Sequence, residues 1–159
     1  MAKKISVGIA DMKIARQEGE LITYALGSCI GITFYDPMIK LGALLHIMLP
    51  EKTATDSNIW KYADSGIRET LRKLYVFGGM KGRLVIKIAG GAKMFEMKGP
   101  GGLGNIGERN AQSVKRILMM EGLRVSAEDI GANYARTMSL DVSTGQVYVR
   151  TAGKPERKL

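Results

Sequence analysis

Cysteine and histidine are the scarcest reactive residues of this 159-residue chain, which contains one of each, Cys29 and His46. A single cysteine can form neither an internal disulfide nor a metal site built from several thiolates. Cys29 is therefore either an inert core residue or a reactive thiol. A cysteine nucleophile with a histidine base, if the chain has one, must consist of these two residues.

Long apolar runs are also absent. The longest candidate, residues 41–50, contains Gly42, His46 and Pro50 and is shorter than the roughly 18 apolar residues that span a bilayer. The N-terminal Met-Ala-Lys-Lys lacks the apolar stretch and cleavage site of a signal peptide. We therefore expect a cytoplasmic protein without membrane insertion, folded as one domain over residues 1–159 with a short mobile tail at 154–159.

Aromatic residues are few, with three Phe, six Tyr and one Trp, and they form no stacking motif of the kind that binds single-stranded nucleic acid. Basic residues are in excess, because 24 Lys and Arg against 15 Asp and Glu give a net charge of +9. A field of this sign favours an anionic partner, and an acidic protein surface suits it. Nucleic acid is not the expected partner, and an RNA-binding domain with salt-dependent affinity is the least favoured alternative.

Strand-like segments outnumber helical ones. Apolar spacing predicts a helix over about 58–77, and a capping-box pattern at Asn105 and Glu108 predicts a second over about 106–121. Strands are predicted at 4–10, 20–25, 29–35, 40–48, 83–88, 123–126, 135–142 and 146–151. The predicted fold class is α+β, a layered sandwich of mixed, largely antiparallel β-sheet flanked by two main helices.

The segments 29–35 and 40–48 surround a turn sequence, Asp-Pro-Met-Ile at 36–39, and are predicted to form an antiparallel hairpin. A turn centred between Pro37 and Met38 makes one face wholly apolar and places Cys29 directly opposite His46. Opposed Cβ atoms lie about 4.5–5.5 Å apart, so thiol and imidazole would be in contact.

Such a contact favours a thiolate–imidazolium pair, in which the charged histidine stabilises a nucleophilic thiolate. The turn at Gly27 and Ser28, immediately before the thiol, could offer backbone N–H groups to an oxyanion. The alternative is structural, with Cys29 as a buried apolar residue and His46 as a hydrogen-bonded core histidine.

Several segments of the sequence together form a recognisable pattern: Thr-Tyr-Ala-Leu-Gly-Ser-Cys at 23–29, Asp-Pro at 36–37, Leu-His-Ile-Met-Leu-Pro at 45–50, Lys-Tyr-Ala-Asp at 61–64, Lys-Ile-Ala-Gly-Gly-Ala-Lys-Met-Phe at 87–95, Asn-Ile-Gly-Glu-Arg-Asn at 105–110, Ser-Thr-Gly at 143–145 and Val-Arg at 149–150. In these segments, which extend over nearly the whole chain, the sequence resembles the CheD family of chemoreceptor glutamine deamidases.

The resemblance implies a Cys-His-Thr site and a fold like those of the cytotoxic necrotizing factor-like cysteine hydrolases. Cys29 falls on the nucleophile, His46 on the base and Thr23 on the residue that orients the histidine. The implied reaction converts glutamines on the cytoplasmic helices of chemoreceptors to glutamates and releases ammonia, and some members also hydrolyse glutamyl methyl esters. No cofactor or metal is implied. The implied partners are the chemoreceptors and the phosphatase CheC, and we expect a monomer when unbound.

The sequence also allows two other interpretations. A non-catalytic chemotaxis adaptor could bind receptors or CheC through the same basic surface, although the three site residues argue against it. Residues 102–107 match the dinucleotide pattern G-x-G-x-x-G. That pattern requires a tight strand-to-helix turn, and residues 92–101 intervene here. We interpret these glycines as a flexible loop.

Overall fold

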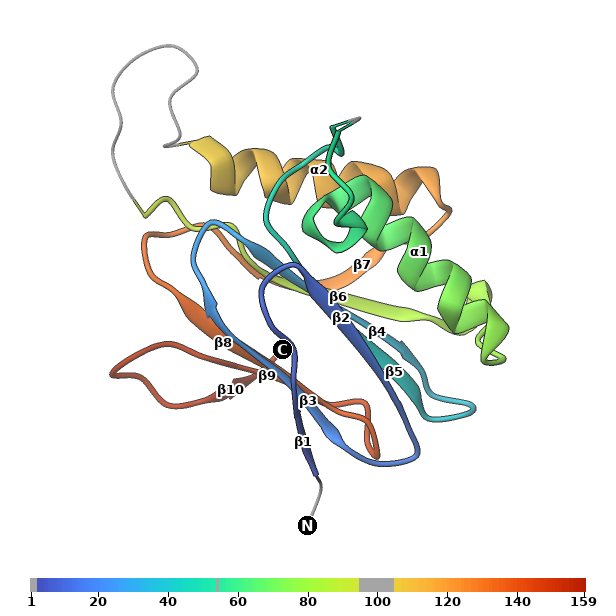
Figure 1. Ribbon diagram of the computed structural model, residues 1–159. Coiled ribbons are helices and arrows are strands. Elements are labelled where there is room, and N and C mark those ends of the chain that lie inside the picture. The colour runs from blue at the N-terminus through green and yellow to red at the C-terminus, as the bar shows by residue number, and fades with distance from the viewer. Residues whose placement is uncertain (1–2, 54, 95–104) are drawn as a thin grey trace.

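The computed structural model describes residues 3–53, 55–94 and 105–159. Two five-stranded sheets lie face to face in the described part of the chain, and both α-helices cover the outer face of one of them (Figure 1). Sheet 1 has the order β1-β3-β8-β9-β10, and sheet 2 has the order β2-β5-β4-β6-β7. The predicted α+β layered class is therefore confirmed.

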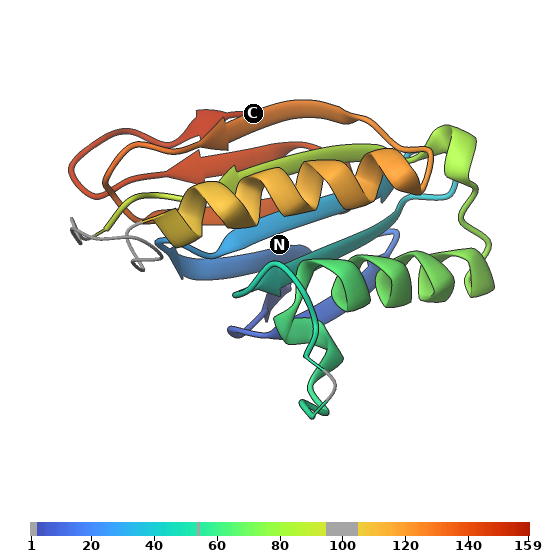
Figure 2. The ribbon, with the colours of Figure 1, turned by 90° about the horizontal axis from the view of Figure 1, so that it is seen from above.

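The strands of sheet 1 are β1 (Lys4–Ser6), β3 (Glu20–Leu26), β8 (Arg136–Asp141), β9 (Val147–Arg150) and β10 (Arg157–Lys158). Those of sheet 2 are β2 (Asp11–Arg16), β4 (Ile30–Asp36), β5 (Leu41–Ile47), β6 (Val85–Gly90) and β7 (Val125–Ile130). The helices are α1 (Ala63–Val76) and α2 (Ile106–Met120), with short 3-10 turns at Ile59–Lys61 and Lys81–Arg83. Figure 2 shows α1 and α2 lying along the same face of sheet 2.

The apolar core has two layers. Ile30, Ile32 and Phe34 of β4 pack with buried residues of α1 and α2. On the other face of sheet 2, Leu44 packs with Leu21 and other residues of sheet 1. Every residue of β4 and β5 is buried, because these central strands are covered on both faces. A side chain that points from them toward sheet 1 is therefore shielded from water.

The β4–β5 hairpin exists, but its register is shifted by two residues from the predicted one. Gly31, and not Cys29, lies opposite His46, and Asp36 pairs with Leu41. The prediction assumed a two-residue turn, whereas the loop spans residues 37–40, with Lys40 at a φ of +47°. Because side chains alternate with a period of two, the shift keeps each residue on its predicted face.

The predicted boundaries of several other helices and strands differ from those in the structure. Helix α1 begins at Ala63, after the 3-10 turn, and not near residue 58. Helix α2 begins where predicted, but Asn105 makes no side-chain capping bond. Strand β2 was not predicted. Residues 102–104 of the glycine pattern lie outside the described part of the chain.

The C-terminal residues make defined contacts. Strand β10 pairs with β9, and the Leu159 N–H donates to the Val147 carbonyl at 2.9 Å. Lys87 donates to the Leu159 carbonyl at 2.7 Å. The mobility expected for residues 154–159 stays a prediction. Among the described residues, no helix is both long and apolar enough to cross a membrane.

Gly90, at the end of β6, permits a close approach that holds the Cys29 segment. Its φ is +115°, and a Cβ atom at this position would overlap the Cys29 carbonyl oxygen. We predict that Gly90→Ala lowers the free energy of unfolding by about 3 kcal/mol or more, through both clash and backbone strain. Urea denaturation measures the loss.

The matched control is Gly82→Ala, because a Cβ atom at Gly82 meets nothing within 4 Å. It should change the free energy of unfolding by less than about 1 kcal/mol. Equal losses in the two variants would contradict the close approach at Gly90.

Candidate active site

Thr23 of β3 and His46 of β5 meet between the two sheets. Both residues have 0% of their surface exposed, and Thr23 Oγ1 lies 2.7 Å from His46 Nδ1. The sequence pattern gave Thr23 no special status beyond a strand threonine, and only the family resemblance singled it out. The structure brings together these two of the three expected site residues.

The hydrogen bonds of Thr23 determine which ring nitrogen of His46 carries the proton. The Thr23 hydroxyl has one proton, which it donates to the Val7 carbonyl at 2.7 Å. Thr23 must therefore accept a hydrogen bond from Nδ1–H of His46, and in the neutral ring Nε2 is left as the basic nitrogen. Among the described residues, His46 Nε2 has no hydrogen-bond partner.

Burial also sets the charge of His46. Removal from water disfavours the imidazolium form and lowers the pKa of His46 from 6.5 to about 4. The ring is thus neutral at neutral pH, with a free lone pair on Nε2. Buried polar atoms are nearly always hydrogen-bonded, so a buried Nε2 without a partner among the described residues is unusual for a core histidine.

Cys29 lies just before β4 and is half-buried. It packs against the apolar cluster between the sheets, which is the layer that His46 also faces. Because Gly31 is opposite His46, Cys29 lies two residues before the position that faces His46. This is a diagonal relation, for which Cα atoms lie about 7–8 Å apart. The predicted direct opposition of Cys29 and His46 is therefore wrong, while their shared face is confirmed.

Burial raises the pKa of the Cys29 thiol, although a hydrogen bond from its own backbone N–H partly offsets this effect. The shifts of Cys29 and His46 both favour the uncharged forms, because burial penalises each charge. Both directions oppose the thiolate–imidazolium pair expected from the sequence and favour a thiol beside a neutral imidazole.

The carbonyl groups of Gly27, Ser28 and Cys29 each accept a hydrogen bond from a residue distant in the sequence. They accept hydrogen bonds from Ala92 N, from Asn110 Nδ2 and from Gly91 N, at 2.8, 2.9 and 2.9 Å respectively. No peptide bond of the described chain is cis, so the N–H of each peptide points opposite to its carbonyl. The Ser28 and Cys29 amides are thereby turned away from these partners. Cys29 N–H faces its own sulfur.

A bulge in β3 shapes the approach to this turn. The pairing of β3 with β8 shifts between Thr23 and Leu26, and Ala25 has a φ of +57°. Thr23 and Leu26 are buried, whereas Tyr24 and Ala25 are exposed. The extra residue lets Thr23 and Leu26 both point inward, which places the Gly27–Cys29 turn at the end of the sheet interface.

Arg136 supports the same region from β8. It is 2% exposed and donates to the Asp129 carboxylate at 3.1 Å and to the Gly131 carbonyl at 2.9 Å. Arg157 of β10 binds the other oxygen of Asp129. Because Gly131 N–H donates in turn to the Gly90 carbonyl, the buried Arg136–Asp129 pair stabilises the strand end that holds Cys29.

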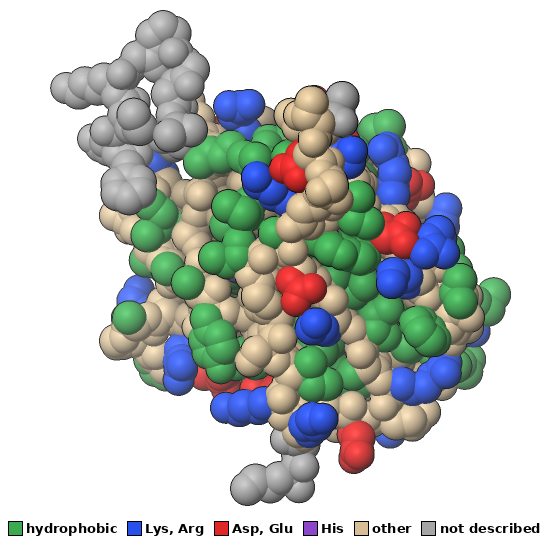
Figure 3. All heavy atoms as spheres, in the orientation of Figure 1, with side chains coloured by type: hydrophobic (Ala, Val, Ile, Leu, Met, Phe, Trp, Pro, Cys, Tyr) green, Lys and Arg blue, Asp and Glu red, His purple; other side chains and the backbone are tan. Residues whose placement is uncertain are grey.

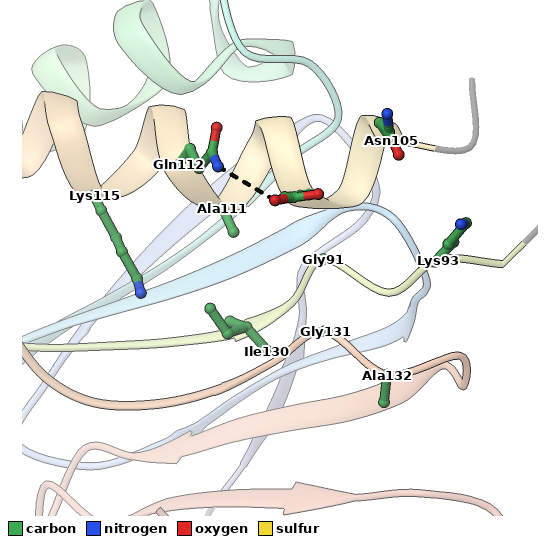
Figure 4. Close-up of a pocket in the computed structure, with 10 residues that line it drawn as sticks. Gly91, Lys93, Asn105, Ala111, Gln112, Lys115, Ile130, Gly131 and Ala132 are labelled. Atoms are coloured by element: carbon green, nitrogen blue, oxygen red, sulfur yellow. Dashed lines mark hydrogen bonds between the residues drawn. The ribbon is translucent and has the colours of Figure 1, made fainter. Parts of the chain in front are cut away.

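A cavity of about 520 Å³ lies beside Gly91, next to the Cys29 turn. Figure 4 shows it between the first half of α2 and the segments around Gly91 and Gly131. Neither Cys29 nor His46 lines this cavity. Gly91 forms part of its wall, and its N–H binds the Cys29 carbonyl, so the cavity is next to the site without containing it.

A thiol on the same buried layer as a histidine with a free nitrogen is the combination from which cysteine-nucleophile enzymes are built. Comparison with known proteins gives the family. The family model described as CheD chemotactic sensory transduction matches residues 48–151. The chain belongs to the CheD family.

Three relatives illustrate the similarity, each named "Probable chemoreceptor glutamine deamidase CheD". The protein from Desulforamulus reducens is 46% identical over 96% of this chain and 93% of its own length. The protein from Syntrophomonas wolfei is 45% identical over 99% of both chains. The protein from Pyrococcus abyssi is also 45% identical, over 94% of this chain and 93% of its own length.

The neutral state of His46 predicts a pH dependence of stability. The folded-state pKa of about 4 lies below the ordinary value of 6.5, so the unfolded chain binds a proton at a pH where the folded protein does not. The free energy of unfolding should therefore fall by about 3 kcal/mol as the pH drops from 6.5 to 4, through this group alone.

Urea denaturation of the wild type and of His46→Gln across this pH range measures the effect. The difference between the two proteins isolates His46, because the other titrating groups are shared. A difference that stays constant with pH would show that the folded and unfolded pKa values are the same.

Proposed function

We propose that this protein deamidates glutamine side chains on the cytoplasmic helices of chemoreceptors, with Cys29 as nucleophile, His46 as base and Thr23 as the residue that positions His46. The names of the relatives suggest this substrate. The observation that carries the chemistry is the buried imidazole, whose Nδ1 is held by Thr23 and whose Nε2 has no partner in the described part of the chain. A base with its proton on the far nitrogen is what activation of a thiol requires.

In the first half of the reaction, His46 Nε2 takes the thiol proton as Cys29 Sγ attacks the amide carbon of the glutamine. The carbonyl oxygen becomes an oxyanion, for which the Cys29 N–H is the proposed donor. The imidazolium is charged only transiently, and Thr23 accepts the hydrogen bond from its Nδ1–H. Collapse of the intermediate transfers the proton to the departing nitrogen, which releases ammonia and leaves a thioester.

In the second half, a water molecule loses a proton to His46 Nε2 and attacks the thioester carbonyl. The same backbone donor holds the second oxyanion. Cleavage of the carbon–sulfur bond gives a glutamate carboxylate, and the proton on His46 returns to Cys29. The net reaction is amide plus water to carboxylate plus ammonium, and each group of the site ends in its starting state.

The charge of the protein suits this substrate. Figure 3 shows Lys and Arg side chains distributed over the visible face, with fewer acidic ones between them. The methylated helices of chemoreceptors are expected to be acidic, and a protein of net charge +9 would be attracted to them. CheC stays a predicted second partner on the basis of the family resemblance.

We predict that Cys29→Ala abolishes conversion of glutamine to glutamate in a receptor fragment, because the thioester cannot form. The fold should persist, since the replacement removes one half-buried sulfur atom. Mass spectrometry of the fragment measures the conversion. Wild-type protein that binds the fragment but releases no ammonia would support the non-catalytic adaptor instead.

We further predict that Thr23→Val lowers kcat roughly 10- to 100-fold, a loss similar to that seen when a functional histidine loses its outer hydrogen-bond partner. Thr23→Ser should retain most of the activity, because it keeps the hydroxyl. Steady-state kinetics with the receptor fragment tests both variants.

Thr33→Val is the matched control, since Thr33 is also buried and donates to a strand carbonyl, that of Lys87 at 3.3 Å. Its kcat should change less than about twofold. Equal effects at Thr23 and Thr33 would remove the case for a special role of Thr23.

A further inference from the structure

Asn110 of α2 links the segment that carries Cys29 to the segment that follows His46. It lies in the second turn of α2 and has 0% of its surface exposed. Its side-chain amide donates to the Ser28 carbonyl at 2.9 Å and to the Met48 carbonyl at 2.8 Å. Ser28 immediately precedes Cys29, and Met48 is two residues beyond His46, so one amide group holds the nucleophile segment and the base segment together.

The orientation of this amide follows from its surroundings. An Asn side chain has two N–H donors and one carbonyl acceptor, and both of its neighbours are carbonyl oxygens. A flipped amide would place three oxygen atoms against one another, so the N–H groups must face Ser28 and Met48. Among the described residues, Asn110 Oδ1 has no partner. Both donors are thus used, while the buried acceptor Oδ1 is left unsatisfied. A residue that only filled space would not carry this energetic cost.

The bond to Ser28 has a consequence for Cys29. In a trans peptide, the carbonyl of Ser28 and the N–H of Cys29 point in opposite directions. A carbonyl held against α2 therefore turns the Cys29 N–H toward the interior of the site, where it faces the thiol sulfur. The same N–H is the proposed oxyanion donor.

The placement of α2 makes this contact rigid. A Cβ atom at Gly107 would overlap the backbone of Gly91 and Ala92, so the first turn of α2 packs directly on the segment that binds the Gly27 and Cys29 carbonyls. Asn110 reaches the Ser28 carbonyl from one turn further along the same helix.

We propose that Asn110 is a positioning residue, which aims the Cys29 N–H at the reacting oxygen and fixes the Cys29 segment relative to the His46 strand. This inference rests on the proposed function, in which Cys29 is the nucleophile. Asn110 acts through the backbone and does not itself contact the substrate. The sequence carries no signal for this role beyond the presence of Asn110 in a segment that resembles the family.

The test compares Asn110→Ala with Ser113→Ala. Ser113 lies one turn further along α2, is 5% exposed and donates to the Pro50 carbonyl at 3.0 Å, so it makes the same kind of helix-to-backbone bond without touching the Cys29 turn. For Asn110→Ala we expect kcat on the receptor fragment to fall roughly 10- to 100-fold, with KM changed less than about threefold. For Ser113→Ala both constants should stay within about twofold of the wild type.

A second readout needs no receptor. The rate of Cys29 alkylation by iodoacetamide, measured against pH, reports the thiol directly because Cys29 is the only cysteine. In Asn110→Ala the midpoint of this profile should move to higher pH, since the N–H that stabilises the thiolate is no longer aimed at it. In Ser113→Ala the midpoint should not move. If Asn110→Ala does not fold, Asn110→Ser carries the same two tests.

An Asn110 variant that folds, keeps kcat within about twofold of the wild type and keeps the alkylation midpoint would overturn the inference. Equal losses of kcat in the Asn110 and Ser113 variants would do so too, because they would indicate a general effect of α2. Activity in Cys29→Ala is a different outcome, which would contradict the proposed function. The alkylation profile would then still decide whether Asn110 aims the Cys29 amide.

Discussion

The hydrogen bond between Thr23 and His46 across the sheet interface is the interaction on which the candidate site depends. Thr23 gives its proton to the Val7 carbonyl, so it can only accept from His46 Nδ1. This single constraint orients the ring, selects the tautomer and leaves Nε2 free. Complete burial then keeps the ring neutral. In the proposed reaction this ring is the base, and among the described residues its buried Nε2 has no hydrogen-bond partner.

The second part of the site is made of backbone. The turn before Cys29 is held by three carbonyl contacts, from Gly91, Ala92 and Asn110, and the glycine at 90 lets two strands approach closely enough to make them. Catalytic geometry that is built from peptide groups needs rigid support, because a small rotation of one peptide redirects its N–H. The fold supplies that support with α2 on one side and the buried Arg136 on the other.

The sequence predicted the layered α+β class, helix α1 and the faces of the central hairpin from apolar periodicity. It predicted α2 from a capping-box pattern, although Asn105 makes no side-chain capping bond. It predicted the wrong register for Cys29 and His46, since loop length decides register and a four-residue loop is not evident from Asp36 and Pro37. It missed β2, a strand at the edge of sheet 2 in which three of the six residues are charged. Thr23 and Asn110 could not be found from residue pattern, because their roles depend on contacts between segments distant in the sequence.

The state of the His46 ring tests this account most directly. His46 is the only histidine, so protein labelled with nitrogen-15 at histidine gives the signals of one imidazole by NMR. We predict a neutral ring at about pH 6, with the proton on Nδ1 and none on Nε2, and protonation of Nε2 only near pH 4. A proton on Nε2 of the neutral ring, or a ring that is already charged at about pH 6, would contradict the account.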